Sequence, residues 1–222
     1  RAAGGALSCL YGNATFEIAG NIDADVTLSF SANGNIVNYN GGGAQNIATT
    51  TYYNLTLSNA GVKSALGNFA LRGNWTRSGT ATFTPAGFTV TLNALAGTAA
   101  QTIAAVGGET FAGLTINSAF ATSPQVTLNN AITISGILTM TAGNVNLNGN
   151  SATLSSTASG ALVHGLTSAS GWMYGSSIIR SRPASTAITV GTARSLFPLG
   201  SSTDWRPFFV GQNSNANSAG TM

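Results

Sequence analysis

Residues 45–57 read QNIATTTYYNLTL, and a related stretch at residues 101–116 reads QTIAAVGGETFAGLTI. Both begin with Gln, one variable residue and Ile, and both end with an aromatic residue followed by a short pattern of apolar residue, Thr and apolar residue. A second pair of stretches, FALRG at Phe69–Gly73 and ITISG at Ile132–Gly136, repeats at a similar offset of about 60 residues. Such self-similarity is typical of architectures in which one unit stacks on the next and small insertions are accepted at the turns.

Within each copy, apolar residues alternate with Thr, Ser or Asn. Leu55–Ser58 (LTLS), Ile132–Ser135 (ITIS) and Val145–Asn148 (VNLN) are three examples. This period of two predicts strands with one buried face and one exposed face. Asn-Gly, Ala-Gly and Gly-Gly pairs lie between these segments, and Gly accepts the positive φ that tight corners need. No segment has the apolar spacing of an amphipathic helix, so we expect an all-β chain.

Short strands at close spacing are compatible with a sandwich or with a solenoid. The repeat favours the solenoid, because each unit then buries its apolar face only against its neighbours. We therefore expect a right-handed parallel β-helix, that is a β-solenoid, over residues 1–171, with roughly three turns in each repeat and about eight turns in all. At residues 172–222 we expect the start of a further β-domain, either a C-terminal β cap or a partial β-sandwich segment, which ends in a polar tail.

Four asparagines, at positions 144, 146, 148 and 150, alternate with other residues. On a strand they would share one face, where amides stacked from turn to turn can hydrogen-bond with one another. This predicts a ladder of asparagine side chains along the solenoid, a feature that requires no ligand.

The composition separates this chain from most enzymes. Of its 222 residues only 6% are charged, with one His and one Cys, while 43% are hydrophobic. Gly, Thr, Ser and Asn together supply 103 residues, a profile that we interpret as that of a secreted, repetitive β-structure. The hydrophobic share is sufficient for a core, so disorder is not expected. No run of about 18 apolar residues is present, so we expect no membrane-spanning segment.

The charges are unevenly distributed along the chain. Residues 1–171 carry four basic and four acidic side chains, whereas residues 172–222 carry four arginines and one aspartate. The formal net charge of +3 therefore belongs to the C-terminal segment, which supports treating that segment as a separate unit. The basic residues form no stripe, so nucleic acid is not an expected partner.

Asp23 and Asp25 are the only closely spaced pair of carboxylates. Two residues apart on a strand, they would face the same side, with Glu17 as a neighbour. Two carboxylates together with carbonyl oxygens can begin a Ca2+ site, so this pair is our candidate for metal binding, against the simpler interpretation of a solvated strand or turn. No other cofactor is expected. Polysaccharide hydrolysis would also have to use this pair, because Glu109 and Asp204 lie far along the chain.

Nucleophilic catalysis has little support in the sequence. His164 lies in a Ser-rich stretch, residues 155–170, but no G-x-S-x-G nucleophile motif is present. Cys9 is the single cysteine, which excludes an intrachain disulfide and a metal site built from several cysteines. We therefore expect no enzymatic activity.

Aromatic and arginine residues gather toward the C-terminus. Aromatic faces and guanidinium groups suit flat ligands such as sugars. The simpler interpretation is that such a cluster closes the end of a solenoid or forms the core of the next domain. The candidate residues for ligand binding or assembly are Trp172, Tyr174, Arg180, Arg182, Trp205 and Arg206.

Two sets of residues follow the pattern of a known family. One extends from Gln45 to Lys63, continues at Gly73 and Ser78–Thr80 and recurs from Gln101, and the other comprises Phe197–Gly200 and Trp205–Phe208. The first set resembles the β-helical repeats of large secreted, adhesin-like cell-surface proteins of Bacteroidota-type Gram-negative bacteria, and the second resembles the stretch that follows those repeats. The resemblance implies a β-helix in an extracellular setting, as one segment of a longer protein, and it names neither ligand nor reaction.

Two hypotheses about function follow. The first is a structural, non-enzymatic protein of the cell surface, a subunit or segment of a filament, stalk or adhesin. It would assemble head-to-tail with copies of itself or with other segments of a longer chain, because the ends of a solenoid are unpaired strand edges and few charges keep copies apart.

The second hypothesis is a carbohydrate-binding or polysaccharide-degrading β-helix protein with surface glycans as partners. The positions of Asp23, Asp25, Trp172 and Trp205 would discriminate between the two hypotheses. Convergence in one groove would favour carbohydrate binding, and scattered positions would favour the scaffold.

Overall fold

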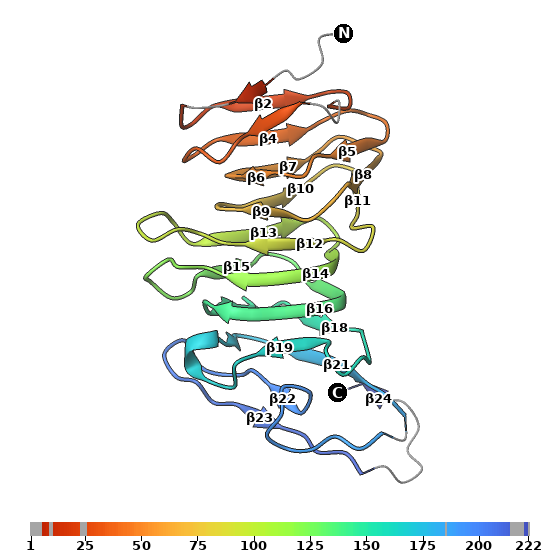
Figure 1. Ribbon diagram of the computed structural model, residues 1–222, viewed down its shortest axis with the longest axis vertical. Helices are drawn as coiled ribbons and strands as arrows, with labels where there is room; N and C mark the ends of the chain where they lie inside the picture. Colours follow the sequence, from red (N-terminus) through yellow and green to blue (C-terminus); the bar gives the residue numbers. More distant parts are fainter. Residues whose placement is uncertain (1–5, 9–10, 23–25, 185, 214–219, 222) are drawn as a thin grey trace.

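The computed structural model describes residues 6–8, 11–22, 26–184, 186–213 and 220–221. In these ranges the chain is all-β, and parallel strands stack along one axis to form a β-solenoid of about seven turns (Figure 1). The one helical element among the described residues is a short 3-10 turn at Ser168–Ser170. The predicted class, an all-β parallel solenoid, is confirmed.

Strands of each turn lie on three faces that follow one another in chain order. The first face carries an eight-stranded parallel sheet that runs the length of the solenoid. Its strands are β2 (Thr15–Ile18), β4 (Ile36–Tyr39), β7 (Asn54–Leu57), β10 (Trp75–Arg77), β13 (Gln101–Ala105), β15 (Val126–Leu128), β17 (Val145–Asn146) and β20 (Met173–Tyr174).

The second and third faces begin as separate sheets. The second face starts with β5 (Gln45–Ile47), β8 (Val62–Ala65) and β11 (Thr82–Thr84), and the third face starts with β6 (Thr51–Tyr52), β9 (Phe69–Leu71) and β12 (Thr89–Leu92).

In the later turns one long strand serves both of these faces. β14 (Glu109–Asn117) and β16 (Ile132–Ala142) pair along two segments, with a register shift between Phe111 and Gly113. The first half of β16 also pairs with β18 (Ala152–Leu154), which pairs with β21 (Ile178–Arg182), and its second half pairs with β19 (Leu162–His164). The two strands therefore continue the second face and the third face without a break.

The two ends of the solenoid differ. At the N-terminal end, β1 (Ala6–Ser8) pairs in parallel with β3 (Thr27–Ser29). At the C-terminal end the pairing becomes antiparallel, between β22 (Leu196–Phe197) and β23 (Phe208–Phe209) and between β24 (Gly220–Thr221) and β21. We call residues 183–213 the cap.

Parallel stacking extends beyond residue 171. Met173 pairs with Val145, and Ile178 pairs with Ala152, both in parallel register. The last turn of the solenoid therefore includes residues on the C-terminal side of the boundary expected from the change in charge.

The sequence repeat does not correspond to a whole number of turns. Gln45 lies on β5 of the second face, whereas its counterpart Gln101 lies on β13 of the first face. Likewise Phe69 on the third face corresponds to Ile132 at the start of β16. Each repeat is thus one face short of three turns, so the expectation of three turns per repeat is wrong. The motif describes a strand with its corner, which fits any of the three faces.

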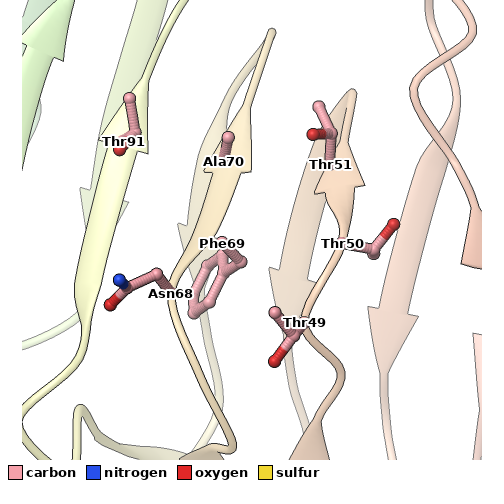
Figure 2. Close-up of a pocket in the computed structure, with 7 residues that line it drawn as sticks. All are labelled: Thr49, Thr50, Thr51, Asn68, Phe69, Ala70 and Thr91. Carbon is pink, nitrogen blue, oxygen red and sulfur yellow. The ribbon is translucent and has the colours of Figure 1, made fainter.

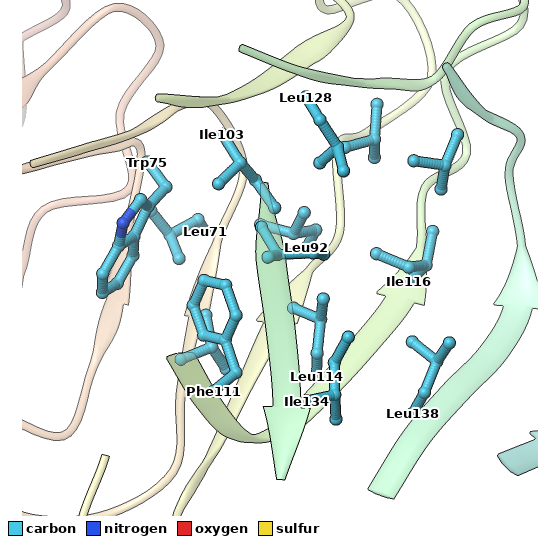
Figure 3. Close-up of a cluster of buried hydrophobic side chains, with 14 of the residues drawn as sticks. Leu71, Trp75, Leu92, Ile103, Phe111, Leu114, Ile116, Leu128, Ile134 and Leu138 are labelled. Atoms are coloured by element: carbon cyan, nitrogen blue, oxygen red, sulfur yellow. The ribbon is translucent and has the colours of Figure 1, made fainter. Parts of the chain in front are cut away.

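The core consists of columns of apolar side chains that lie one above another. Trp75 pairs with Leu55 in one neighbouring turn and with Ile103 in the other, and all three side chains are fully buried. Figure 3 shows how Trp75, Phe111 and the aliphatic residues around them fill the space between the faces. The Trp75 and Phe111 rings meet edge to face with centroids 5.3 Å apart. Each apolar side chain therefore depends on the turns above and below it.

Buried glutamines hold the corners together. Gln101 donates from Nε2 to the carbonyls of Leu71 and Gly73 in the preceding turn, at 2.9 and 2.7 Å, and its Oε1 accepts from Ala94 N–H. Gln45 makes the equivalent pair of bonds, to the carbonyls of Ile18 and Gly20, although it lies on another face. Gln45 and Gln101 share this geometry, which explains why the motif begins with Gln. The amide satisfies backbone groups that leave the sheet at a corner.

Asparagines also connect turns, but not through the expected ladder. The φ of Asn148 is +50°, so the strand has already ended there, and the four asparagines do not share one strand face. Asn150 donates to the Leu128 carbonyl of the turn before. At another corner Asn54 donates to the Asn35 carbonyl and accepts from Asn74 N–H. In these two examples the amides bond to backbone groups of neighbouring turns.

Replacing Gln101 by Leu should destabilise the fold, because two carbonyls and one N–H lose their partner inside the protein. We expect a loss of about 2–5 kcal/mol in the free energy of unfolding, measured by urea denaturation. The control is Thr102→Val, a change at the neighbouring outward side chain, which should alter stability by about 0.5 kcal/mol or less. Equal stability of the two variants would contradict the bracing role.

Candidate functional site

The candidate residues near the C-terminus separate into different arrangements. Trp172 is buried, donates from Nε1 to the Ser201 carbonyl at 2.7 Å and lies 6.3 Å from the ring of Trp205. The Trp205 ring stacks on the imidazole of His164, with centroids 5.1 Å apart and an interplanar angle of 6°. These aromatic rings contact one another across the junction of solenoid and cap, so they pack together at the end of the solenoid.

Arg180 and Arg182 end the apolar core. They face inward on β21, and Arg180 pairs with Leu154 of β18, so a guanidinium group follows an aliphatic column. Both guanidinium groups lie over the Phe197 ring of the cap, at 5.7 and 5.2 Å from its centroid. Such contacts between a cation and an aromatic face are favourable when desolvated.

Carbonyl groups of the cap complete this arrangement. Arg180 donates to the Leu196 carbonyl and to the Ala193 carbonyl, and Arg182 donates to the Arg194 carbonyl. Burial, and secondarily the charge of Arg182, lower the pKa of Arg180 to about 10, so it stays charged at neutral pH. In the described part of the chain, Nε and Nη2 of Arg182 have no acceptor, but both atoms are enclosed by protein and offer no open surface to an anion.

The last two candidates lie apart from these contacts. Arg206 is exposed and forms an ion pair with Asp204 at 3.4 Å. Tyr174 is half-buried on β20, in register with Asn146 of the neighbouring strand. The six residues therefore do not converge on one groove.

The carboxylates predicted to bind Ca2+ cannot be assessed together. Asp23 and Asp25 lie outside the described residues. Glu17 accepts hydrogen bonds from the side-chain amides of Asn38 and Asn40, at 2.9 and 2.6 Å. Within the described ranges, no group of three or more His, Cys, Asp or Glu side chains is arranged to hold a metal ion.

One buried ion pair was not anticipated from the sequence. Glu109 Oε2 accepts from Arg77 Nε at 2.9 Å and from Trp75 Nε1 at 3.1 Å. Arg77 donates in addition to the carbonyls of Ala81 and Val106, so it binds a corner of the solenoid. Burial raises the pKa of Glu109, although the charge of Arg77 acts in the opposite direction. The only signal in the sequence is a single acidic residue, directly after two glycines, in a nearly uncharged stretch.

The side chain of Lys63 also has a structural role. Its side chain is fully buried, and Nζ donates to the Gly41 carbonyl and to Gln45 Oε1, each at 2.6 Å. Burial lowers the pKa of the amine. Because its ammonium is enclosed by acceptors from the previous turn, Lys63 braces a corner in the same manner as Gln45.

The outer faces carry aligned threonines and shallow grooves. Thr91, Thr115 and Thr139 occupy one register position on successive strands of the third face. Farther toward the N-terminus, Ala70 lies between Thr51 and Thr91, and the missing side-chain volume leaves an open groove of about 500 Å³ (Figure 2). Its lining contains no charged side chain: Thr49, Thr50, Thr51, Asn68, Phe69, Ala70 and Thr91. No carboxylate, imidazole or amine, the usual general acids and bases, is among these lining residues.

Comparison with known proteins gives no relative: no family model, no curated protein and no solved structure matches the chain. Among the described residues there is no helix of the length and apolar character required to cross a membrane.

Two substitutions of Glu109 should lower the stability of the protein by very different amounts. Glu109→Ala leaves Arg77 and the indole N–H of Trp75 without their buried acceptor, and we expect a loss of about 3–5 kcal/mol in the free energy of unfolding. Glu109→Gln keeps an oxygen acceptor at the same place and should lose at least about 2 kcal/mol less. Thermal and urea denaturation at pH 7 measure both values, and equal losses would show that the negative charge of Glu109, rather than an acceptor oxygen at this place, stabilises the corner.

Proposed function

We propose that this chain is a non-catalytic scaffold, a rigid stalk or spacer segment of an extracellular surface protein of the filament, stalk or adhesin type. The observation that carries the proposal is the use of the buried polar groups. Gln45, Lys63, Gln101 and Glu109 all form their hydrogen bonds with neighbouring strands and corners, and all four side chains are buried. The buried polar side chains therefore join one turn to the next.

The outer faces support the same proposal. Parallel strands place equivalent side chains about 4.8 Å apart, so like charges in one column would repel strongly. The columns instead carry uncharged hydroxyls, such as Thr56 next to Thr76 and Thr102 next to Thr127. A surface of this kind lets many turns follow one another, which is what a spacer requires.

The unequal ends favour a stalk over a filament that grows at both ends. At the C-terminal end β24 covers the edge of β21, and Leu199 forms a bridge to Met173 of β20. At the other end β2 pairs with β4 on one side and with no other strand of the described residues. A further turn from the same protein would therefore add at β2. The extracellular setting rests on the composition and on the resemblance described above.

Carbohydrate binding, the second hypothesis, has less structural support. Trp205 and Trp172 already contact each other, and Trp205 stacks on His164. A glycan array together with a panel of acidic and neutral polysaccharides tests it directly. Under the scaffold proposal we expect neither retention nor cleavage, and specific retention of one glycan would favour the second hypothesis.

Removing the cap should change the association state of the protein. We expect the chain of 222 residues to sediment as a monomer up to high concentration, because its C-terminal strand edges are covered. A variant truncated after Arg182 exposes the edges of β20 and β21 and should self-associate in sedimentation velocity and form particles in negative-stain images. Circular dichroism checks that the truncated chain stays β-rich. Fibres formed by the full chain would contradict the stalk form of the proposal, and a folded, monomeric truncated chain would contradict the role of the cap.

A further inference from the structure

His164 is the single histidine of the chain and lies where the cap meets the solenoid. It is the last residue of β19 and pairs with Met140 of β16 in the turn before. Its side chain is 7% exposed, between the loop Gly165–Ser170 on one side and the Trp205 ring of the cap on the other. One imidazole therefore contacts both the last turn and the cap.

The hydrogen bonds define which tautomer is present. The Leu166 N–H donates to Nδ1 at 2.9 Å, so Nδ1 must present a lone pair. Nε2 lies 2.9 Å from the Gly171 carbonyl and must therefore carry the proton and donate it. The neutral imidazole with hydrogen on Nε2 satisfies both contacts at once.

The loop that His164 holds has an unfavourable backbone conformation. Leu166 has φ of +59°, in the left-handed region that branched and bulky residues rarely adopt. Its N–H bond to Nδ1 and the bond from Gly165 N–H to Ser170 Oγ keep the loop closed. Loss of the first bond would release a conformation that costs about 1–3 kcal/mol to maintain.

Protonation is incompatible with this arrangement. A proton on Nδ1 would point at the Leu166 N–H, so two donors would face each other 2.9 Å apart. The imidazolium could still donate to Gly171 and stack on Trp205, a contact worth about 0.5–2 kcal/mol. It would nevertheless have to bury its charge and find a new acceptor for Nδ1–H, which requires the loop to move.

Few charged groups face this site. His164 is the only titratable residue in β16, β19 and the loop 165–171, and β20 contributes Tyr174. From the cap, Asp204 and Arg206 flank Trp205, but both are exposed and paired with each other. No carboxylate of the described residues contacts the imidazole to stabilise its charged form.

We propose that His164 is a pH-sensitive latch: the neutral imidazole holds the cap on the last turn of the solenoid, and the imidazolium releases it. The sign follows from burial. Burial lowers the pKa of His164, while the bond to Gly171 acts in the opposite direction. With a folded pKa below the unfolded value of about 6.5, the stabilisation is complete above about pH 6.5 and is lost as the pH falls through the folded pKa.

The single histidine makes the titration unambiguous. In proton NMR, its Cε1–H resonance should titrate below about 6.5 in the full chain and near 6.5 in the urea-unfolded chain. At pH values between the folded and the unfolded pKa of His164, the equilibrium constant for release of the cap should rise up to about tenfold for each unit of decrease in pH. Amide hydrogen exchange of Leu166 and of the cap, divided by intrinsic rates at each pH, measures that opening.

A matched pair of variants separates the latch from a structural role. His164→Gln supplies one acceptor and one donor without a titrating group, so cap exchange should become independent of pH between 5 and 7. Arg206→Gln alters the charge beside Trp205 and should keep the wild-type pH dependence. If His164→Gln fails to fold, the NMR titration of the wild-type chain still decides. A folded pKa of 6.5 or above, or a pH-dependent cap in His164→Gln, would overturn the proposal.

Discussion

The in-register stacking of parallel strands is the constraint on which the rest of this structure depends. Within a face, a paired side chain lies beside its equivalent on the neighbouring turn, about 4.8 Å away. In the core, this spacing favours columns of apolar side chains such as Leu55, Trp75 and Ile103. Outside, it penalises like charges and favours hydroxyl and amide side chains. The scarcity of charge, first an argument against catalysis, is thus also a consequence of the fold.

Stacking also requires hydrogen-bond partners at the corners, because backbone N–H and C=O groups leave the sheet there. Gln45, Gln101 and Lys63 provide them by reaching back to carbonyls of the preceding turn. Arg77 with Glu109 performs a similar task at a longer corner. Most of the buried polar chemistry of this solenoid therefore maintains the stack.

Several features of the structure could be predicted from sequence because they are local. Alternation of apolar and polar residues indicated the strands, and the repeat indicated stacking. The number of turns per repeat could not be predicted, since the motif of Gln45 and Gln101 describes one corner, and a corner fits any face. The partners of Trp205 and Arg182 were also beyond prediction, because His164 and Phe197 meet them only after the cap folds back on the last turn. Asp23 and Asp25 stay a prediction, as they lie outside the described residues.

The cap makes the two ends of the solenoid different. Arg180 and Arg182 end the apolar core with charge, Phe197 covers them, and Trp205 closes on His164. Arg180, Arg182 and Trp205, which are candidates for ligand binding or assembly on the sequence, lie where the stacking stops. In our proposal this gives a spacer with one covered end and one end at β2 where a further turn fits.

Cysteine cross-linking in a Cys9→Ser background measures the in-register stacking of neighbouring turns. Thr56 pairs with Thr76, and Thr76 pairs with Ala104, all on the first face. Cysteines at 56 and 76, or at 76 and 104, would lie about 5 Å apart and should form a disulfide on mild oxidation. Cysteines at 56 and 104 are separated by an intervening strand, beyond the roughly 7 Å that a disulfide can span, and should stay reduced. Efficient cross-linking of 56 with 104, or none in the two neighbouring pairs, would show that the strands of the first face are not stacked in this register.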